Sequence, residues 1–66
     1  MEEYVPSPIL RYFDYHHLLP HLAVVSEPFY NLAVELDKTL PDESEEKAVA
    51  LRKLLESKDA AVRSVI

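Results

Sequence analysis

The chain has 66 residues and contains neither cysteine nor glycine, and each absence excludes or disfavours whole classes of protein. Without cysteine there is no disulfide and no thiolate metal site, and nothing points to an oxidising compartment. Without glycine no position relies on it to reach positive φ, which disfavours tight hairpins, glycine-rich phosphate loops and most all-β folds. Helix is therefore the expected secondary structure.

A long hydrophobic run and a basic leader are also missing. The longest uncharged run, residues 15–26, contains three histidines and a proline and is far from the roughly 20 apolar residues of a membrane span. The first three residues, Met-Glu-Glu, lack the basic start of a signal peptide. We expect a soluble protein in the cytoplasm.

The length allows one domain, residues 1–66, whose core barely offsets the entropy of ordering the chain. Apolar residues make up 48% of the chain, which favours folding over disorder. Since disulfides are excluded, association with further copies is the remaining way to stabilise so small a domain.

The net charge of −5 argues against binding to DNA or RNA polymers. Charge is uneven, because residues 1–43 hold two basic and eight acidic side chains, whereas residues 44–66 hold five basic and four acidic ones. An anion site should therefore use the second half. Its candidate cations are Arg52, Lys53, Lys58 and Arg63, and the alternative is that they form a solvated helix face.

Hydrophobic spacing predicts a first helix over residues 20–39, preceded by an arm over residues 1–19. The arm begins extended because Pro6 and Pro8 restrict its backbone, and residues 9–19 fit either a short helical turn or an extended segment. Apolar residues then recur at steps of three and four, on one stripe of a helix: Leu22, Val25, Phe29, Leu32, Ala33, Leu36 and Leu40. Pro28 either bends this helix or begins it.

A second helix is predicted over residues 42–65. Asp42 and Glu45 have the spacing of a capping box, with Ser44 as a competing cap. Because the connection is short, the two helices should run antiparallel. The predicted fold class is all-α: an antiparallel two-helix hairpin with an aromatic arm, assembled into a homo-oligomeric helical bundle (a dimer or a higher assembly). Assembly is expected because a single hairpin leaves half of each apolar stripe exposed to solvent.

Three aromatic rings and two imidazoles gather in residues 11–17. Tyr12, Phe13 and Tyr15, with Tyr30 from the first predicted helix, can stack on nucleobases, or these rings can pack against the end of the bundle. Lys58 interrupts the apolar stripe of the second helix, so its ammonium must reach water along its stem, pair with an acid or meet an anionic ligand.

We expect no metal, no cofactor and no catalysis. His17 and His21 have the spacing of a helical metal site, but Pro20 lies between them and marks a helix boundary. The serines lie at predicted caps or on polar faces, and no carboxylates pair in a predicted cleft.

The arrangement resembles the small phage-encoded helical-hairpin sponges that sequester the cyclic-nucleotide messengers of bacterial CBASS and Thoeris immunity. The resemblance rests on Phe13-Asp14-Tyr15-His16 before the first helix, Leu32-Ala33 within it, Pro41 in the turn, and the second-helix segments 50–54 and 58–63. The chain departs from the pattern at Asp59, where asparagine is expected, and in having no basic residue in the first helix before Lys38.

The resemblance implies a homo-oligomer in the cytoplasm of the infected host cell that binds messengers in pockets between protomers, without turnover. The ligand-binding candidates are then Tyr12, Tyr15 and His16 for the bases, and Arg52, Lys53, Lys58 and Arg63 for the phosphates. The rival hypothesis is a protein-binding or structural oligomer, such as a small phage regulator, whose aromatic arm packs on a partner.

Overall fold

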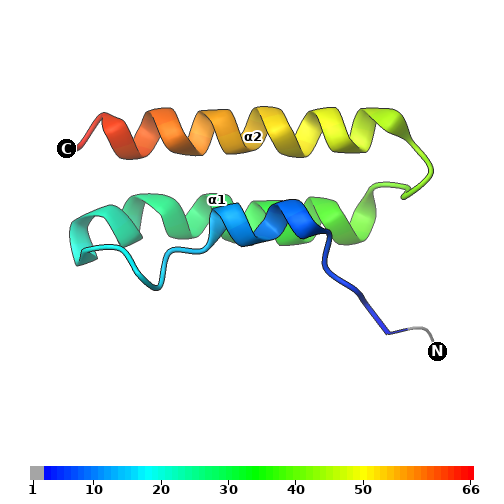
Figure 1. Ribbon diagram of the computed structural model, residues 1–66, viewed down its shortest axis with the longest axis horizontal. Coiled ribbons are helices and arrows are strands. Elements are labelled where there is room, and N and C mark those ends of the chain that lie inside the picture. Colours follow the sequence, from blue (N-terminus) through cyan, green and yellow to red (C-terminus); the bar gives the residue numbers. More distant parts are fainter. Residues whose placement is uncertain (1–2) are drawn as a thin grey trace.

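A computed structural model describes residues 3–66, and within that range the chain is helical and contains no strand. A 3₁₀ helix, η1, spans Pro8–Phe13, and two long helices follow, α1 over Pro20–Thr39 and α2 over Glu45–Arg63. The long helices run side by side in opposite directions, with the loop of residues 40–44 joining them (Figure 1). The all-α class and the antiparallel hairpin are confirmed.

Helix α1 occupies the range that the hydrophobic spacing predicts. Pro20 begins it, at a position where the missing N–H has no intrahelical partner to lose. The sequence left open whether the helix continues through Pro28 or begins there. Pro28 lies inside α1, so the structure has one continuous helix. At the other end the N–H of Leu40 bonds the carbonyl of Leu36 at 2.9 Å, and Pro41 follows, which cannot continue the ladder.

Helix α2 is shorter than predicted, and the predicted capping box is wrong. The helix begins at Glu45 rather than residue 42, Ser44 occupies the N-cap without a side-chain hydrogen bond, and the last helical residue is Arg63 rather than residue 65. The Asp42 carboxylate does not cap the helix because it bonds the ammonium of Lys47. Two acids in the first turn and Arg63 in the last still match the helix dipole.

The predicted arm is partly helical and folds back onto the hairpin. Its residues 1 and 2 lie outside the described range, and the segment left open between helical and extended contains η1. Helix η1 contacts both α1 and α2, and in Figure 1 it lies in front of α1 and runs along it. The hydrophobic side chains buried in the described range come from all three elements: Leu10, Phe13, Ala33 and Leu51.

Phe13 shows why the arm docks. Its ring is 0% exposed, so at least one aromatic ring of the arm belongs to the core. Full burial of a phenylalanine side chain stabilises a fold by roughly 1.5–3 kcal/mol. The hairpin therefore has one face covered by η1, and η1 brings the neighbouring residues Arg11 and Tyr12 into place.

Candidate functional site

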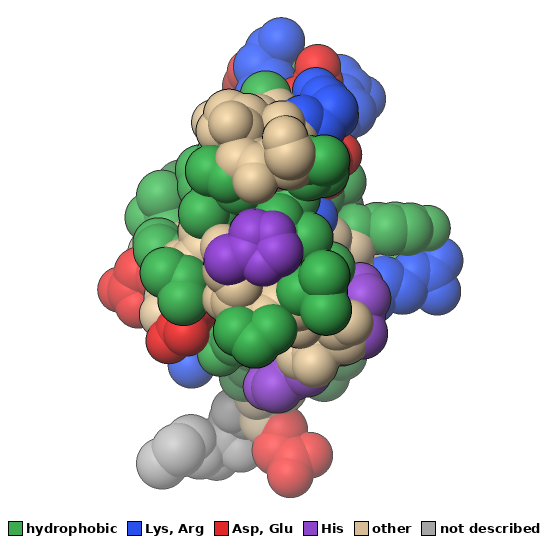
Figure 2. All heavy atoms as spheres, turned by 90° about the vertical axis from the view of Figure 1, so that its left-hand side faces the viewer, with side chains coloured by type: hydrophobic (Ala, Val, Ile, Leu, Met, Phe, Trp, Pro, Cys, Tyr) green, Lys and Arg blue, Asp and Glu red, His purple; other side chains and the backbone are tan. Residues whose placement is uncertain are grey.

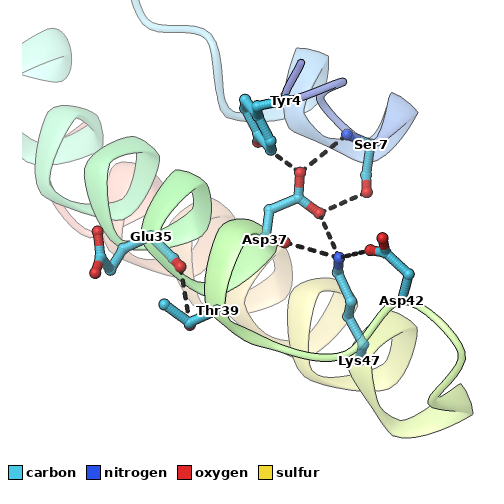
Figure 3. Close-up of polar contacts among 7 residues, drawn as sticks. All are labelled: Tyr4, Ser7, Glu35, Asp37, Thr39, Asp42 and Lys47. Carbon is cyan, nitrogen blue, oxygen red and sulfur yellow. Dashed lines mark hydrogen bonds and ion pairs between the residues drawn. The ribbon is translucent and has the colours of Figure 1, made fainter. Parts of the chain in front are cut away.

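A cluster of buried charges fastens the arm to the hairpin (Figure 3). Asp37 of α1 is 4% exposed, and its carboxylate accepts hydrogen bonds from the Tyr4 hydroxyl at 2.6 Å, the Ser7 N–H at 3.0 Å and the Ser7 hydroxyl at 2.5 Å. Lys47 of α2 lies on the other side, with its Nζ 3.1 Å from Asp37 Oδ1. One carboxylate thus joins the arm, α1 and α2.

Lys47 completes the cluster by bonding both α1 and the interhelical loop. Its ammonium donates to the backbone carbonyl of Asp37 at 2.8 Å and to Asp42 Oδ1 at 2.5 Å. A buried ammonium with three oxygen partners is paired and hydrogen-bonded, as burial of a charge requires. The cluster therefore fixes the α1–α2 turn as well as the arm, and we assign it a structural role.

The pKa directions in this cluster follow from the contacts. Burial raises the pKa of Asp37, but the hydrogen bonds from Ser7, Tyr4 and Lys47 outweigh it and hold that pKa well below its usual range. Burial, with the hydrogen bond to the Asp37 carboxylate, raises the pKa of Tyr4 to about 12. The bond to Asp42 raises the pKa of Lys47, against the opposing effect of burial.

A second feature is the cleft between η1, the loop after it, and the last turns of α2. Its volume is about 350 Å³, at the lower end of the roughly 300–1,000 Å³ typical of small-molecule pockets. Three of its side chains are among the predicted ligand-binding residues: Tyr12, Lys58 and Arg63. Arg11, Asp14, His17, Leu18, Asp59 and Val62 complete the lining.

The side chains that line this cleft have a small net positive charge. The lining carries three cations, Arg11, Lys58 and Arg63, against the two carboxylates of Asp14 and Asp59. Lys58 Nζ lies 3.0 Å from Asp59 Oδ1. Of the three arrangements predicted for the Lys58 ammonium, the structure shows the ion pair with an acid, Asp59. Both residues line the cleft.

Tyr12 offers a ring face beside these cations. The residue is 54% exposed, and the Arg11 guanidinium carbon lies 5.1 Å from its ring centroid while Arg11 Nη2 donates to its hydroxyl at 3.2 Å. A cation held at an aromatic ring is a favourable contact. Arg11 was not among the predicted site residues. Its position next to Tyr12 in the sequence could have indicated that it belongs to the same site.

Tyr15 and His16 lie outside the lining of the cleft. Their rings stack on each other with centroids 4.5 Å apart and an interplanar angle of 20°, and Tyr15 meets Tyr30 edge-on at 5.6 Å. Burial, with the negative charge of Glu27 nearby, raises the pKa of Tyr15. The ring of Tyr15 thus packs on α1.

Asp14 holds His16 in place. One carboxylate oxygen of Asp14 contacts the His16 N–H at 3.1 Å and the imidazole Nδ1 at 2.7 Å. The side-chain bond, followed by the backbone bond, lowers the pKa of Asp14. Figure 2 views this end of the molecule face-on and shows histidine side chains among hydrophobic ones, with lysine and arginine side chains at the margins.

The remaining predicted cations stand apart from the cleft. Arg52 is exposed on α2, and Lys53 is exposed beside a hollow near the interhelical loop, at the other end of the molecule. Among residues 3–66 no three histidine, aspartate or glutamate side chains gather as a metal ion would require. In the same range neither long helix has an apolar stretch sufficient to cross a membrane.

Comparisons with known protein families, curated proteins and solved structures find no match to this chain.

Proposed function

We propose that the protein is a non-enzymatic phage anti-defence sponge that binds a cyclic oligonucleotide or cyclised ADP-ribose messenger in the cytoplasm of the host cell. The observation that supports this proposal is the cleft, where Tyr12 stands beside Lys58 and Arg63. Such ligands combine flat bases with phosphates, and the cleft combines an exposed ring with cations. Hairpin architecture and the resemblance noted above point to the same class of function.

Each side chain has a role that its chemistry suits. The exposed ring of Tyr12 stacks on a base, which is worth roughly 1–3 kcal/mol for each stacked base. Arg63 presents a planar guanidinium that binds phosphate oxygens in a bidentate manner, and Lys58 adds a compact second charge. The Arg11 guanidinium lies over the Tyr12 ring and helps to hold it in place.

The cleft is open on its solvent side, so a neighbouring protomer closes it over the ligand. The volume of about 350 Å³ in one chain is small for a ligand of two or three nucleotides, since drug-sized ligands are usually buried over 70–90% of their surface. In this proposal two such clefts share one messenger, which is held without turnover.

Calorimetric titration with a panel of cyclic dinucleotides, cyclic trinucleotides and cyclised ADP-ribose tests the proposal. Arg63→Ala removes a cation from the cleft, while Arg52→Ala removes the same side chain from the same helix outside it. We expect Arg63→Ala to weaken binding by at least about tenfold, since a hydrogen bond to a charged group contributes roughly 1.5–3 kcal/mol. Arg52→Ala should leave the affinity within about twofold, as for other contacts away from the ligand.

Two results would contradict the sponge. One is the absence of heat with every ligand at tens of micromolar protein, and the other is equal weakening by the two arginine variants.

The rival function, an oligomeric protein-binding or regulatory protein without a nucleotide ligand, is favoured by the packing of Tyr15 against His16 and Tyr30. It predicts that Tyr15→Ala disturbs assembly, whereas the sponge predicts an assembled Tyr15→Ala variant. Native mass spectrometry of both proteins, with and without the messenger panel, separates the two functions.

A further inference from the structure

The face of the hairpin opposite η1 carries an apolar stripe along both long helices. At about 100° per residue, steps of three and four keep residues on one side of a helix. On α1 this side presents Val25, Phe29, Leu32 and Leu36, and on α2 it presents Ala50, Leu54, Ser57 and Ala61. The α2 residues that line the clefts beside η1 lie on another side of that helix: Ala48, Leu51, Asp59, Val62 and Arg63.

Exposure confirms that this face is only half covered. Leu32 is 47% exposed, and Val25, Phe29, Leu36, Leu54, Ala50 and Ala61 are half-buried. None of the eight stripe residues carries a charge. A continuous uncharged stripe across two helices marks an interaction surface rather than scattered surface hydrophobics.

The total surface of the chain is larger than that of an average folded monomer of its mass. The accessible area is 4968 Å² for a chain of 7.6 kDa. A folded monomer of that mass is expected to expose about 4,300 Å². The excess of about 700 Å² belongs to the whole chain, including exposed arm residues such as Val5, which is 79% exposed. A standard protein interface buries roughly 800 Å² on each partner.

The shape of the stripe identifies the occupant as a second copy of this chain. Large side chains stand on α1, among them Phe29, Leu32 and Leu36, while three of the four α2 residues, Ala50, Ser57 and Ala61, are small and only Leu54 is large. A twofold axis parallel to the helices places α1 of one copy over α2 of the other. Large side chains then pack against small ones twice, which is the self-complementarity that an isologous interface needs.

We propose that two chains associate through this face into a four-helix bundle, with the η1 arms on the outside. The interface lies on the opposite side of the hairpin from η1 and forms without any ligand, so it does not depend on the sponge function. It leaves the Tyr12–Arg63 cleft on the outside of the dimer, so the protomer that closes a cleft in the proposed sponge belongs to another dimer.

Sedimentation equilibrium of the full chain without ligand measures the association. At about 100 µM the wild-type protein should have twice the mass of one chain, since standard-size interfaces bind with micromolar or tighter affinity. Leu32→Glu places a charge in the stripe of each copy and should raise the dissociation constant by at least about 100-fold, because burial of an unpaired charge costs several kcal/mol.

Val24→Glu is the matched control. Val24 is 71% exposed on α1 but lies away from the stripe, so this variant should remain dimeric. Circular dichroism establishes that both variants are helical, and Leu32→Ala, which adds no charge, should still weaken the dimer by about tenfold or more. A monomeric wild-type chain at that concentration, or a dimer that Leu32→Glu and Val24→Glu affect equally, would overturn the proposal.

Discussion

Replacing Asp37 by asparagine should be among the most destabilising single-atom changes in this chain. The substitution keeps the shape of the side chain and removes its charge. Asp37 is 4% exposed and receives hydrogen bonds from Tyr4, Ser7 and Lys47, so its oxygens have no access to compensating water. The amide of asparagine has only one acceptor oxygen, and its NH₂ group would face donors.

The magnitude follows from the loss of a buried charge partner. Breaking a buried ion pair by removing one member costs about 3–5 kcal/mol. We take the lower end, about 3 kcal/mol, because Lys47 keeps its contacts to Asp42 and to the Asp37 backbone carbonyl. A domain of this length has a total stability of only about 3–10 kcal/mol, so the variant should retain little of it.

Urea unfolding followed by circular dichroism, at one fixed protein concentration, measures the effect. With a slope near 1 kcal/mol per molar urea, the midpoint should fall by about 3 M. Asp42→Asn is the matched control, because the Asp42 side chain is 90% exposed although it also contacts Lys47. That change should cost below about 1 kcal/mol.

Acid provides a second readout for Asp37. Its folded pKa lies below the unfolded value of about 3.9, so its contribution is present above that pH and is lost as pH falls through the folded pKa. The stability difference between wild type and Asp37→Asn should therefore be constant above about pH 5 and shrink below about pH 4. Equal destabilisation by Asp37→Asn and Asp42→Asn, or a difference that grows in acid, would refute the reasoning.

Two further predictions concern the arm. Spectrophotometric titration should find one tyrosine with a pKa near 12, and this titration step should be absent from Tyr4→Phe. The stability that the neutral Tyr4 hydroxyl contributes should be lost as pH rises from about 10 to 12. Ionisation of every tyrosine near pH 10 would contradict the bond to Asp37. Phe13→Ala should lower the free energy of unfolding by about 3–5 kcal/mol, because the ring is 0% exposed. Tyr12→Ala, at a 54% exposed position, should lower it by less than about 1 kcal/mol. Similar urea midpoints for the two variants would show that η1 is not part of the core.

The sequence predicts the long helices well because their signals are local. Periodicity places α1 over residues 20–39, and its phase continues through Pro28 as the helix does. The start of α2 was mispredicted because the same residue types serve as caps and as ion-pair partners. Asp42 has the capping spacing, yet a lysine five residues later takes its carboxylate.

The charge cluster was missed although its signal is present in the sequence. Asp37 stands four residues after Ala33, and Lys47 four residues before Leu51, so opposite charges occupy the buried sides of both helices. Partners 30 or more residues apart, such as Tyr4 and Asp37, cannot be assigned from spacing at all.

Only part of the predicted set of ligand-binding residues lines the cleft, because local patterns do not report which helices meet. Tyr12 on the arm and Arg63 on α2 come together only because η1 folds back, which no local pattern reports. Arg52 and Lys53 share a helix with Arg63 but do not line the cleft. Arg52 lies about three turns from Arg63 on nearly the same side of α2, and Lys53 lies near the interhelical loop. Membership in a basic helix was therefore too coarse a criterion.

The way the arm is attached also has a consequence for the order of folding. The α1–α2 hairpin closes through a short loop, whereas docking the arm by Asp37 closes a segment of about 30 residues, at a higher entropic cost. The arm should therefore dock last and detach first, as the least stable cooperative unit of the chain. Arg11 and Tyr12 belong to the arm, so the cleft exists only in molecules whose arm is docked. A ligand in the cleft would therefore stabilise the docked arm and slow amide exchange throughout η1.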